Sequence, residues 1–238
     1  MESFGKFVVR KLSEAASILY RALIFPFVRM HVERKTGSIL KKGVYFRNGT
    51  TFAGKDYVGE NSQLDNVHMG FSSMIGRDAV ISNVRIGNYS CASNLETYIG
   101  LHPVKGENIS IYPAFYSTNA QFGHTYVNEN SFTEAKYTDE KNRIQIEIGS
   151  DVWLGYGVKI TEGVTIGDGA VVGAGSLVLT SLEPYGIYAG VPAKKIGQRF
   201  DDETIRKLLE LKWWDKDEKW IKEHAAEFKN PGEFVKNL

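Results

Sequence analysis

The sequence predicts a mainly β protein, in which a parallel β-helix of hexapeptide repeats lies between an N-terminal helical extension and C-terminal α-helices. One observation is a set of aliphatic residues that recur every six positions, at Ile148, Leu154, Ile160, Ile166, Val172 and Val178. A second is a mostly small or β-branched set four positions after each of these, at Val152, Val158, Val164, Ala170, Ser176 and Leu182. Neither the α-helical period of about 3.6 nor the strand period of about 2 gives this spacing. A coil with three flat sides and one hexapeptide per side does.

An earlier and less regular form of the repeat extends from about residue 50 to residue 101. Its aliphatic positions are Val58-Gly59, Leu64, Ile75-Gly76, Ile81, Ile86-Gly87 and Ile99-Gly100. The repeat is then absent between His102 and Glu147. A segment of this length is either a functional excursion or disordered, and its aromatic residues favour a packed loop. We therefore predict a β-helix domain over residues 46–198, with an excursion at residues 102–147.

Residues 1–45 form a predicted basic, amphipathic helical extension. Lys and Arg residues outnumber Glu2, Glu14 and Glu33 in its first 42 positions. The apolar run from Ile18 to Val28 is shorter than the roughly 20 residues of a membrane span and precedes no small-residue cleavage site, so we do not expect a targeting segment. Two interpretations remain open: the helix makes peripheral contact with an anionic membrane, or it plugs the first coil of the β-helix.

Residues 199–238 show a helical period in place of the hexapeptide one. Apolar residues at Ile205, Leu208 and Leu209 predict an amphipathic helix with Asp201 or Asp202 as its N-cap. A second helix is predicted around Trp220. We expect these helices to form a cap over the open end of the β-helix, where strand edges would otherwise be exposed.

The composition limits the kinds of partner. The chain has 238 residues and a formal net charge of +1, so we expect no nucleic acid partner, which would require a concentrated basic surface. Cys91 is the single cysteine, and no Cys/His cluster has zinc spacing, so we expect neither a disulfide nor a required metal. A reducing cytoplasm is the expected location, at the inner face of the membrane if the extension binds lipid.

Several motifs in combination resemble the hexapeptide-repeat acyltransferases. They are Asp151-Val152-Trp153-Leu154-Gly155, Gly163-Val164-Thr165-Ile166-Gly167-Asp168-Gly169-Ala170, Gly173-Ala174-Gly175-Ser176 and Ala189-Gly190-Val191-Pro192-Ala193-Lys194. Gly100-Leu101-His102-Pro103 before the excursion, Arg199-Phe200 and Trp213-Trp214 are similar to the xenobiotic acetyltransferase branch. That branch includes chloramphenicol and streptogramin acetyltransferases and O-acetyltransferases of surface polysaccharides. The resemblance covers about residues 50–234. It implies left-handed winding, acetyl-CoA as co-substrate, and a homotrimer with active sites at the subunit interfaces.

His102 is the candidate catalytic residue. It lies where the repeat breaks and matches the catalytic histidine of the resembled family in position and context. Transfer from a thioester to an alcohol requires removal of the hydroxyl proton, and an imidazole, with a pKa of about 6.5, suits this at neutral pH. The competing interpretation is a structural surface histidine. Cys91 as an acetyl-carrying nucleophile is the less favoured alternative, because it lies within a repeat where small residues pack.

The resemblance also implies positions for coenzyme binding. These are Trp153, Gly155, Tyr156, Ala174, Thr180, Lys194 and Lys195. Many relatives carry Lys where this chain has Ser181, and a basic residue where it has Gly197, so the binding of CoA phosphates depends more on the two lysines. As an alternative, Trp153 packs on a neighbouring subunit.

Aromatic and amide side chains in the excursion are candidates for binding the acceptor. They are Tyr112, Phe115, Tyr116, Asn119 and His124. The segment from Ser110 to Asn119 resembles that of polysaccharide-modifying relatives, and aromatic faces with polar groups suit a sugar. The same residues could instead form the dry core of the loop.

These expectations combine into one function with open alternatives. We expect an acetyl-CoA-dependent O-acetyltransferase that modifies a sugar or a surface polysaccharide precursor by direct transfer in a ternary complex. The alternatives are an antibiotic-inactivating acetyltransferase and an amino-sugar N-acetyltransferase. A zinc enzyme of the carbonic anhydrase type would need His68, His102 and His124 to converge, and a non-catalytic scaffold would need none of them.

Overall fold

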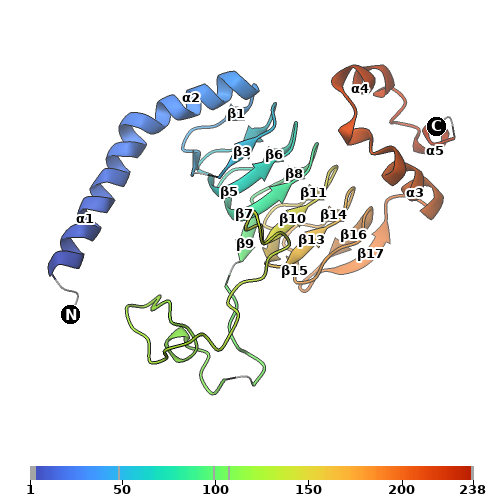
Figure 1. Ribbon diagram of the computed structural model, residues 1–238. Coiled ribbons are helices and arrows are strands. Elements are labelled where there is room, and N and C mark those ends of the chain that lie inside the picture. The colour runs from blue at the N-terminus through green and yellow to red at the C-terminus, as the bar shows by residue number, and fades with distance from the viewer. Residues whose placement is uncertain (1–3, 48, 99, 107, 237–238) are drawn as a thin grey trace.

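The computed structural model describes residues 4–47, 49–98, 100–106 and 108–236. Figure 1 shows a prism of stacked parallel strands, helices at both ends of the chain, and one long loop that projects from the prism. The predicted mainly β fold, with parallel coils and flanking helices, is therefore confirmed. The left-handed winding stays a prediction from the resemblance.

One side of the prism is an eight-stranded sheet. Its strands follow the order β1 (Ile39–Leu40), β4 (Tyr57–Val58), β6 (Met74–Ile75), β8 (Cys91–Ala92), β11 (Trp153–Leu154), β14 (Val171–Val172), β16 (Gly186–Ala189) and β17 (Lys194–Gln198). Neighbours pair in parallel except β17, which runs antiparallel to β16.

The other two sides form one bent sheet of nine strands. They are β2 (Tyr45–Phe46), β3 (Thr51–Phe52), β5 (Gln63–Met69), β7 (Val80–Ile86), β9 (Glu96–Tyr98), β10 (Ile146–Ile148), β12 (Lys159–Thr161), β13 (Val164–Ile166) and β15 (Leu177–Val178). Strands β5 and β7 continue around a corner at Asn66 and Asn83, both in the left-handed conformation, where Asn is tolerated better than most residues.

The register of the strands explains the repeat. Trp153 pairs with Val171, 18 residues later, which is three hexapeptides, whereas Tyr57 pairs with Met74, 17 residues later. Coils one residue shorter account for the slips in the early repeat. Cys91 pairs with Trp153, so the excursion is inserted within one coil without breaking the stack.

The core is the column of aliphatic side chains that the repeat predicts. All six residues of the regular series are at most 3% exposed, and each stacks on its equivalent about 4.8 Å along the axis. The corners are equally tight. A Cβ on Gly155 would lie 2.6 Å from the backbone nitrogen of Ala174, so glycine is required there because the next coil lies directly against it.

The N-terminal extension is a continuous helical segment. It comprises α1 (Phe4–Leu19), a π-helical turn (Tyr20–Ile24) and α2 (Phe25–Thr36), and it ends at Gly37 in the left-handed conformation. Phe25 is buried against Tyr45 and Phe46 of the first coil, with ring centroids 4.8 and 5.0 Å apart. Helix α2 therefore covers the start of the prism, whereas α1 extends away from it (Figure 1).

The C-terminal segment forms α3 (Asp202–Leu211), a 3-10 turn (Trp213–Asp215), α4 (Glu218–His224) and α5 (Pro231–Phe234). Asp201 caps α3 by accepting a hydrogen bond from the Thr204 nitrogen at 2.9 Å. These helices lie along an edge of the prism. The sequence predicts instead that they cover its open end. Asn88 donates to the Trp214 carbonyl, and Lys55 of an early coil pairs with Glu218. Tyr185, Leu208 and Trp214 give this contact an apolar core of its own.

Candidate active site

The excursion is a packed lobe that stands clear of the prism (Figure 1). It leaves after β9, returns at β10, and contains a 3-10 turn at Pro113–Phe115. Tyr116 has no exposed surface. Its ring packs edge-on against that of Phe132, with ring centroids 5.6 Å apart. The predicted packed loop is therefore present, with a small core of its own.

Glu162 ties both ends of the excursion to the prism. It lies between β12 and β13 and is 5% exposed. Its carboxylate accepts hydrogen bonds from the backbone nitrogens of Gly100 and Lys136, each at 3.0 Å, and from Gln145 Nε2 at 2.6 Å. The sequence gives no signal for Glu162, because an isolated glutamate within a repeat belongs to no motif.

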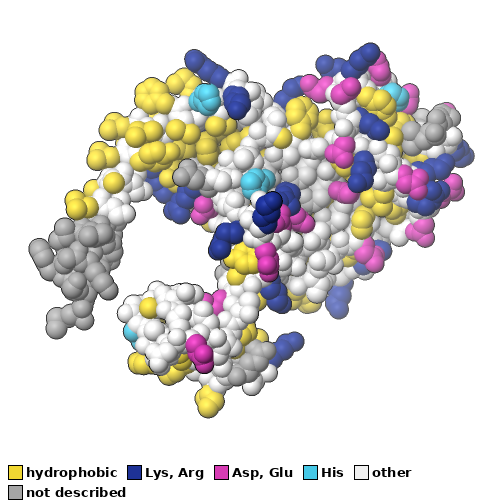
Figure 2. Space-filling view, viewed as in Figure 1, with side chains coloured by type: hydrophobic (Ala, Val, Ile, Leu, Met, Phe, Trp, Pro, Cys, Tyr) yellow, Lys and Arg dark blue, Asp and Glu magenta, His cyan; other side chains and the backbone are white. Residues whose placement is uncertain are grey.

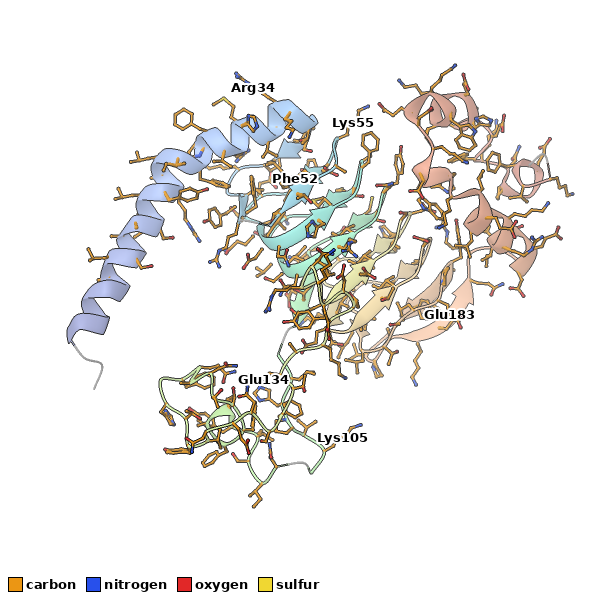
Figure 3. All side chains as sticks on the ribbon, in the orientation of Figure 1. Arg34, Phe52, Lys55, Lys105, Glu134 and Glu183 are labelled. Carbon is orange, nitrogen blue, oxygen red and sulfur yellow. The ribbon has the colours of Figure 1, made fainter. Side chains whose placement is uncertain are left out.

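Glu134 links several side chains of the lobe from the end nearest the prism, where Figure 3 labels it. Its carboxylate accepts from Ser117 Oγ at 3.0 Å, Asn119 Nδ2 at 2.9 Å and Gln121 Nε2 at 2.7 Å. Its own carbonyl accepts from the Leu101 nitrogen at 3.0 Å. Because Leu101 directly precedes His102, the same residue fixes the backbone beside the candidate base.

His102 is exposed, and one edge of its ring is held by the lobe. Its Nδ1 lies 3.1 Å from the Ile111 carbonyl oxygen and 2.8 Å from the Tyr116 hydroxyl oxygen. A carbonyl oxygen can only accept a hydrogen bond, so the Ile111 contact is a hydrogen bond in the tautomer whose proton is on Nδ1, and in that tautomer the Tyr116 hydroxyl oxygen accepts as well. The lone pair of Nε2 is then available, as a general base requires.

Tyr116 contributes to this arrangement from inside the lobe. Burial raises the pKa of its hydroxyl, and the negative charge of Glu134 raises it further, so the hydroxyl keeps its proton and stays neutral beside His102. With its side chain fully buried, Tyr116 contacts the candidate base and not the lobe surface.

The other acceptor candidates lie at the surface of the lobe. Tyr112 stacks on Phe122 with ring centroids 5.5 Å apart and lies 6.0 Å from His124. The Tyr126 ring also belongs to this cluster, because its centroid lies 5.2 Å from that of His124 and 5.1 Å from that of Phe115. The structure thus brings Tyr112, Phe115 and His124 into one exposed aromatic cluster. The Asn119 side chain is bound to Glu134 instead.

The coenzyme candidates lie on the prism. Trp153 and Tyr156 are large, exposed aromatic side chains on a rigid surface, 49% and 63% exposed. Gly155 is buried against exposed Ala174, and Thr180 is exposed. Lys194 forms no ion pair with any residue that the structure describes, whereas Lys195 pairs with Glu183 at 2.6 Å. Figure 3 shows Glu183 at the β16–β17 end of the prism, away from Glu134.

One chain does not bring the two groups of candidates together. Within the described parts of the chain, no hydrogen bond or ion pair joins His102 to any of the seven coenzyme candidates. His68, on β5, bonds to Thr51 at 2.9 Å, whereas His102 and His124 lie in the lobe.

A groove of about 530 Å³ follows the prism edge under the C-terminal segment. Its charged lining includes His68, Arg85, Glu147 and Asp168. Arg85 pairs with Glu147 and, at 2.7 Å, with Asp139, so its guanidinium is already engaged. Burial lowers the pKa of His68, and the nearby Arg85 charge lowers it further. The sequence gives no signal for this groove, because its residues come from four successive coils.

Comparisons with known proteins identify the class of fold. Residues 145–180 match the family described as bacterial transferase hexapeptide (six repeats). The predicted hexapeptide-repeat domain is therefore confirmed.

The curated relatives are named acetyltransferases. A probable macrolide acetyltransferase of Lysinibacillus sphaericus is 57% identical over 68 residues, which cover 29% of this chain and 38% of that protein. A chloramphenicol acetyltransferase of Escherichia coli is 43% identical over 109 residues, covering 45% of this chain and 51% of that protein. The chain thus matches between about a third and a half of the length of these relatives.

Among solved structures, a hexapeptide-repeat acetyltransferase of Vibrio cholerae in complex with acetyl-coenzyme A has a TM-score of 0.48 and 17% identity. The alignment covers 84% of this chain and 92% of that one.

Proposed function

We propose that this protein transfers the acetyl group of acetyl-CoA to a hydroxyl of a sugar or a surface polysaccharide precursor. The relatives that share its repeat are named acetyltransferases. The observation that carries the proposal is the contact of His102 Nδ1 with the Ile111 carbonyl. In the tautomer that donates to this carbonyl, Nε2 is a hydrogen-bond acceptor on an exposed surface.

His102 acts as the general base in this proposal. As the acceptor oxygen attacks the thioester carbonyl carbon, Nε2 takes the hydroxyl proton. Collapse of the tetrahedral intermediate breaks the C–S bond, and the thiolate of CoA leaves with a proton returned from the imidazolium. Burial raises the pKa of the half-buried Cys91 thiol, which makes this cysteine a poorer nucleophile. This argues against an acetyl group carried on Cys91 and supports direct transfer in a ternary complex.

The proposed site lies between subunits of a homotrimer. The lobe carries the base but stands clear of its own prism (Figure 1), while Trp153 and Tyr156 expose aromatic surface on the prism. Docking the lobe of one subunit over the prism of the next would bring both parts together. The exposed Lys194 is then placed to meet a phosphate of CoA.

The acceptor preference rests on the aromatic cluster of the lobe. Ring faces of Tyr112, Phe115 and His124 suit the CH faces of a sugar, and neighbouring polar groups can orient its hydroxyls. The names of the relatives favour a second candidate, an antibiotic acceptor such as chloramphenicol or a macrolide. An amine of an amino sugar is the third.

Initial rates of CoA thiol release from acetyl-CoA, with acceptors supplied at equal concentration, test this proposal. The panel is oligosaccharides, sugar nucleotides, an amino sugar, chloramphenicol and a macrolide. We expect the fastest turnover with a sugar hydroxyl and a product whose acetyl group is released by mild base. Turnover of the antibiotics alone would overturn the sugar preference, and a base-stable product would identify N-acetylation.

A further inference from the structure

An exposed row of large apolar side chains lies along the N-terminal helical segment. Seven side chains in α1, the π-helical turn and α2 are between 40 and 67% exposed: Leu12, Ile18, Leu19, Leu23, Ile24, Phe27 and Met30. Five of them, Leu12, Leu19, Leu23, Phe27 and Met30, recur at helical intervals of seven, four, four and three residues. Figure 2 shows hydrophobic side chains gathered along the outer side of this helix. Exposed apolar surface of this extent marks an interaction site.

The charge around the row has one dominant sign. From residue 3 to residue 36 the sequence has seven Lys or Arg residues and two acidic residues, Glu14 and Glu33, and Glu33 pairs with Arg29. Arg34 and Lys35 are both exposed at the end of α2. A row of aliphatic and aromatic residues with basic residues around it is typical of a helix that lies on an anionic lipid surface.

The contacts of α2 decide whether the helix lies on a bilayer or crosses it. The stretch Lys11–Thr36 is long and apolar enough to cross, because it contains an 18-residue window with a mean hydropathy of 1.2. However, Phe25 is buried in the prism core, Tyr20, Val28 and Val32 pack against that core, and the Arg21 guanidinium lies 3.9 Å above the Tyr45 ring. A span needs about 20 residues surrounded by lipid, and from Tyr20 onward one face is bound to the prism.

We propose that residues 11–31 lie in the plane of an anionic lipid bilayer, with the apolar row inserted and, from Tyr20 onward, the opposite face bound to the prism. A second copy of the chain could also cover an apolar row. The nearly single sign of charge favours lipid, because an interface between copies would bring these cations together. The proposal does not depend on the reaction that the protein catalyses.

Co-sedimentation of the full-length protein with vesicles tests the proposal. One set of vesicles contains phosphatidylcholine and phosphatidylglycerol, and the other contains phosphatidylcholine alone. We expect binding to the anionic vesicles that weakens at high salt, and a loss of at least about tenfold for the double variant Leu23→Ser/Phe27→Ser. Ile196→Ser, at a position 69% exposed on β17, is the matched control and should bind like wild type. A second variant, Arg34→Glu/Lys35→Glu, should reduce binding to the anionic vesicles only.

Three results would overturn the proposal. The first is wild-type protein that stays in solution with the anionic vesicles, and the second is a double variant that sediments as well as wild type. The third is a smaller assembly for Leu23→Ser/Phe27→Ser in solution, measured by light scattering, without vesicle binding by wild type. A smaller assembly of the double variant would assign the row to a contact between copies of the chain.

Discussion

Asp56 is a carboxyl group buried directly before β4, in the second coil of the prism. Its Oδ2 accepts hydrogen bonds from the Gly54 nitrogen at 3.0 Å and from Ser38 Oγ at 3.1 Å, and its Oδ1 accepts from the Ser73 nitrogen at 3.3 Å. Burial raises its pKa from 3.8 to about 6, and these hydrogen bonds offset part of that increase. Asp56 therefore joins three chain segments but is costly to ionise.

This pKa predicts how stability depends on pH. Between about pH 4 and pH 6 the folded protein binds the Asp56 proton more tightly than the unfolded chain does. The contribution of Asp56 to the free energy of unfolding therefore falls as pH rises through this window and is lowest above it. Urea unfolding across the window should show this slope in wild type and a flatter one in Asp56→Asn. Asp65→Asn, at the prism surface, is the control, and an equal slope for wild type and Asp56→Asn would contradict the prediction.

At His102 the sequence predicts the residue but not its surroundings. The histidine is recognisable because it lies where the repeat breaks, within the motif Gly100-Leu101-His102-Pro103. Its Nδ1 partners, Ile111 and Tyr116, are 9 and 14 residues away, and only the fold of the lobe brings them to the ring. Tyr116 was predicted at the acceptor surface, because an aromatic side chain looks the same in a sequence whether it binds a sugar or fills a core.

Among the elements, the excursion depends on its attachment at Glu162. One buried carboxylate accepts from both ends of the lobe, so it couples the position of His102 to the rigid prism. A hydrogen bond to a charged group typically contributes about 1.5–3 kcal/mol, and an unpaired buried N–H costs a comparable amount. Glu162 is a positioning residue in this arrangement.

Glu162→Ala should therefore loosen the lobe while the prism stays folded. We expect faster amide hydrogen exchange in the peptides of residues 100–145 and a lower kcat, with the affinity for acetyl-CoA close to wild type. Hydrogen exchange measured by mass spectrometry and a coenzyme titration check this. Glu203→Ala, on α3 with a side chain 73% exposed, is the control. Unchanged exchange in the lobe would show that Glu162 does not hold it.

The regular coils could be predicted element by element, whereas the C-terminal helices could not be placed. Every sixth residue from Ile148 to Val178 has the same neighbours one coil away, so local pattern and three-dimensional contact coincide. Helix α3 and its Asp201 cap are also local features. Its position along the prism edge depends on Tyr185, Trp213 and Phe234, which come together only in the folded chain. No periodic pattern in the sequence predicts that these three residues lie close together.

At the scale of the whole molecule, the prism and the lobe are two parts that a single chain keeps apart. A rigid column exposes Trp153 and Tyr156, and a packed lobe exposes His102. The proposed homotrimer explains both exposures with one contact, which closed rotational symmetry repeats three times.

Mixed trimers test this contact. His102→Ala and Trp153→Ala chains should each give low activity alone, because each homotrimer lacks one part of every site. In each mixed trimer one of the three interfaces joins an intact lobe to an intact prism, so the mixed species should recover up to about a third of wild-type activity. Purification through two different affinity tags isolates the mixed species. Activity no higher than that of either parent would place both residues in one chain's own site.

The most direct measurement is kcat for acetyl transfer by His102→Ala, determined with the best acceptor and alongside the Kd for acetyl-CoA. Loss of the general base should lower kcat by about 10²- to 10⁴-fold, while Kd stays near that of wild type because the coenzyme candidates lie on the prism. A kcat within a few-fold of wild type would contradict the account, because the imidazole would then not carry the proton.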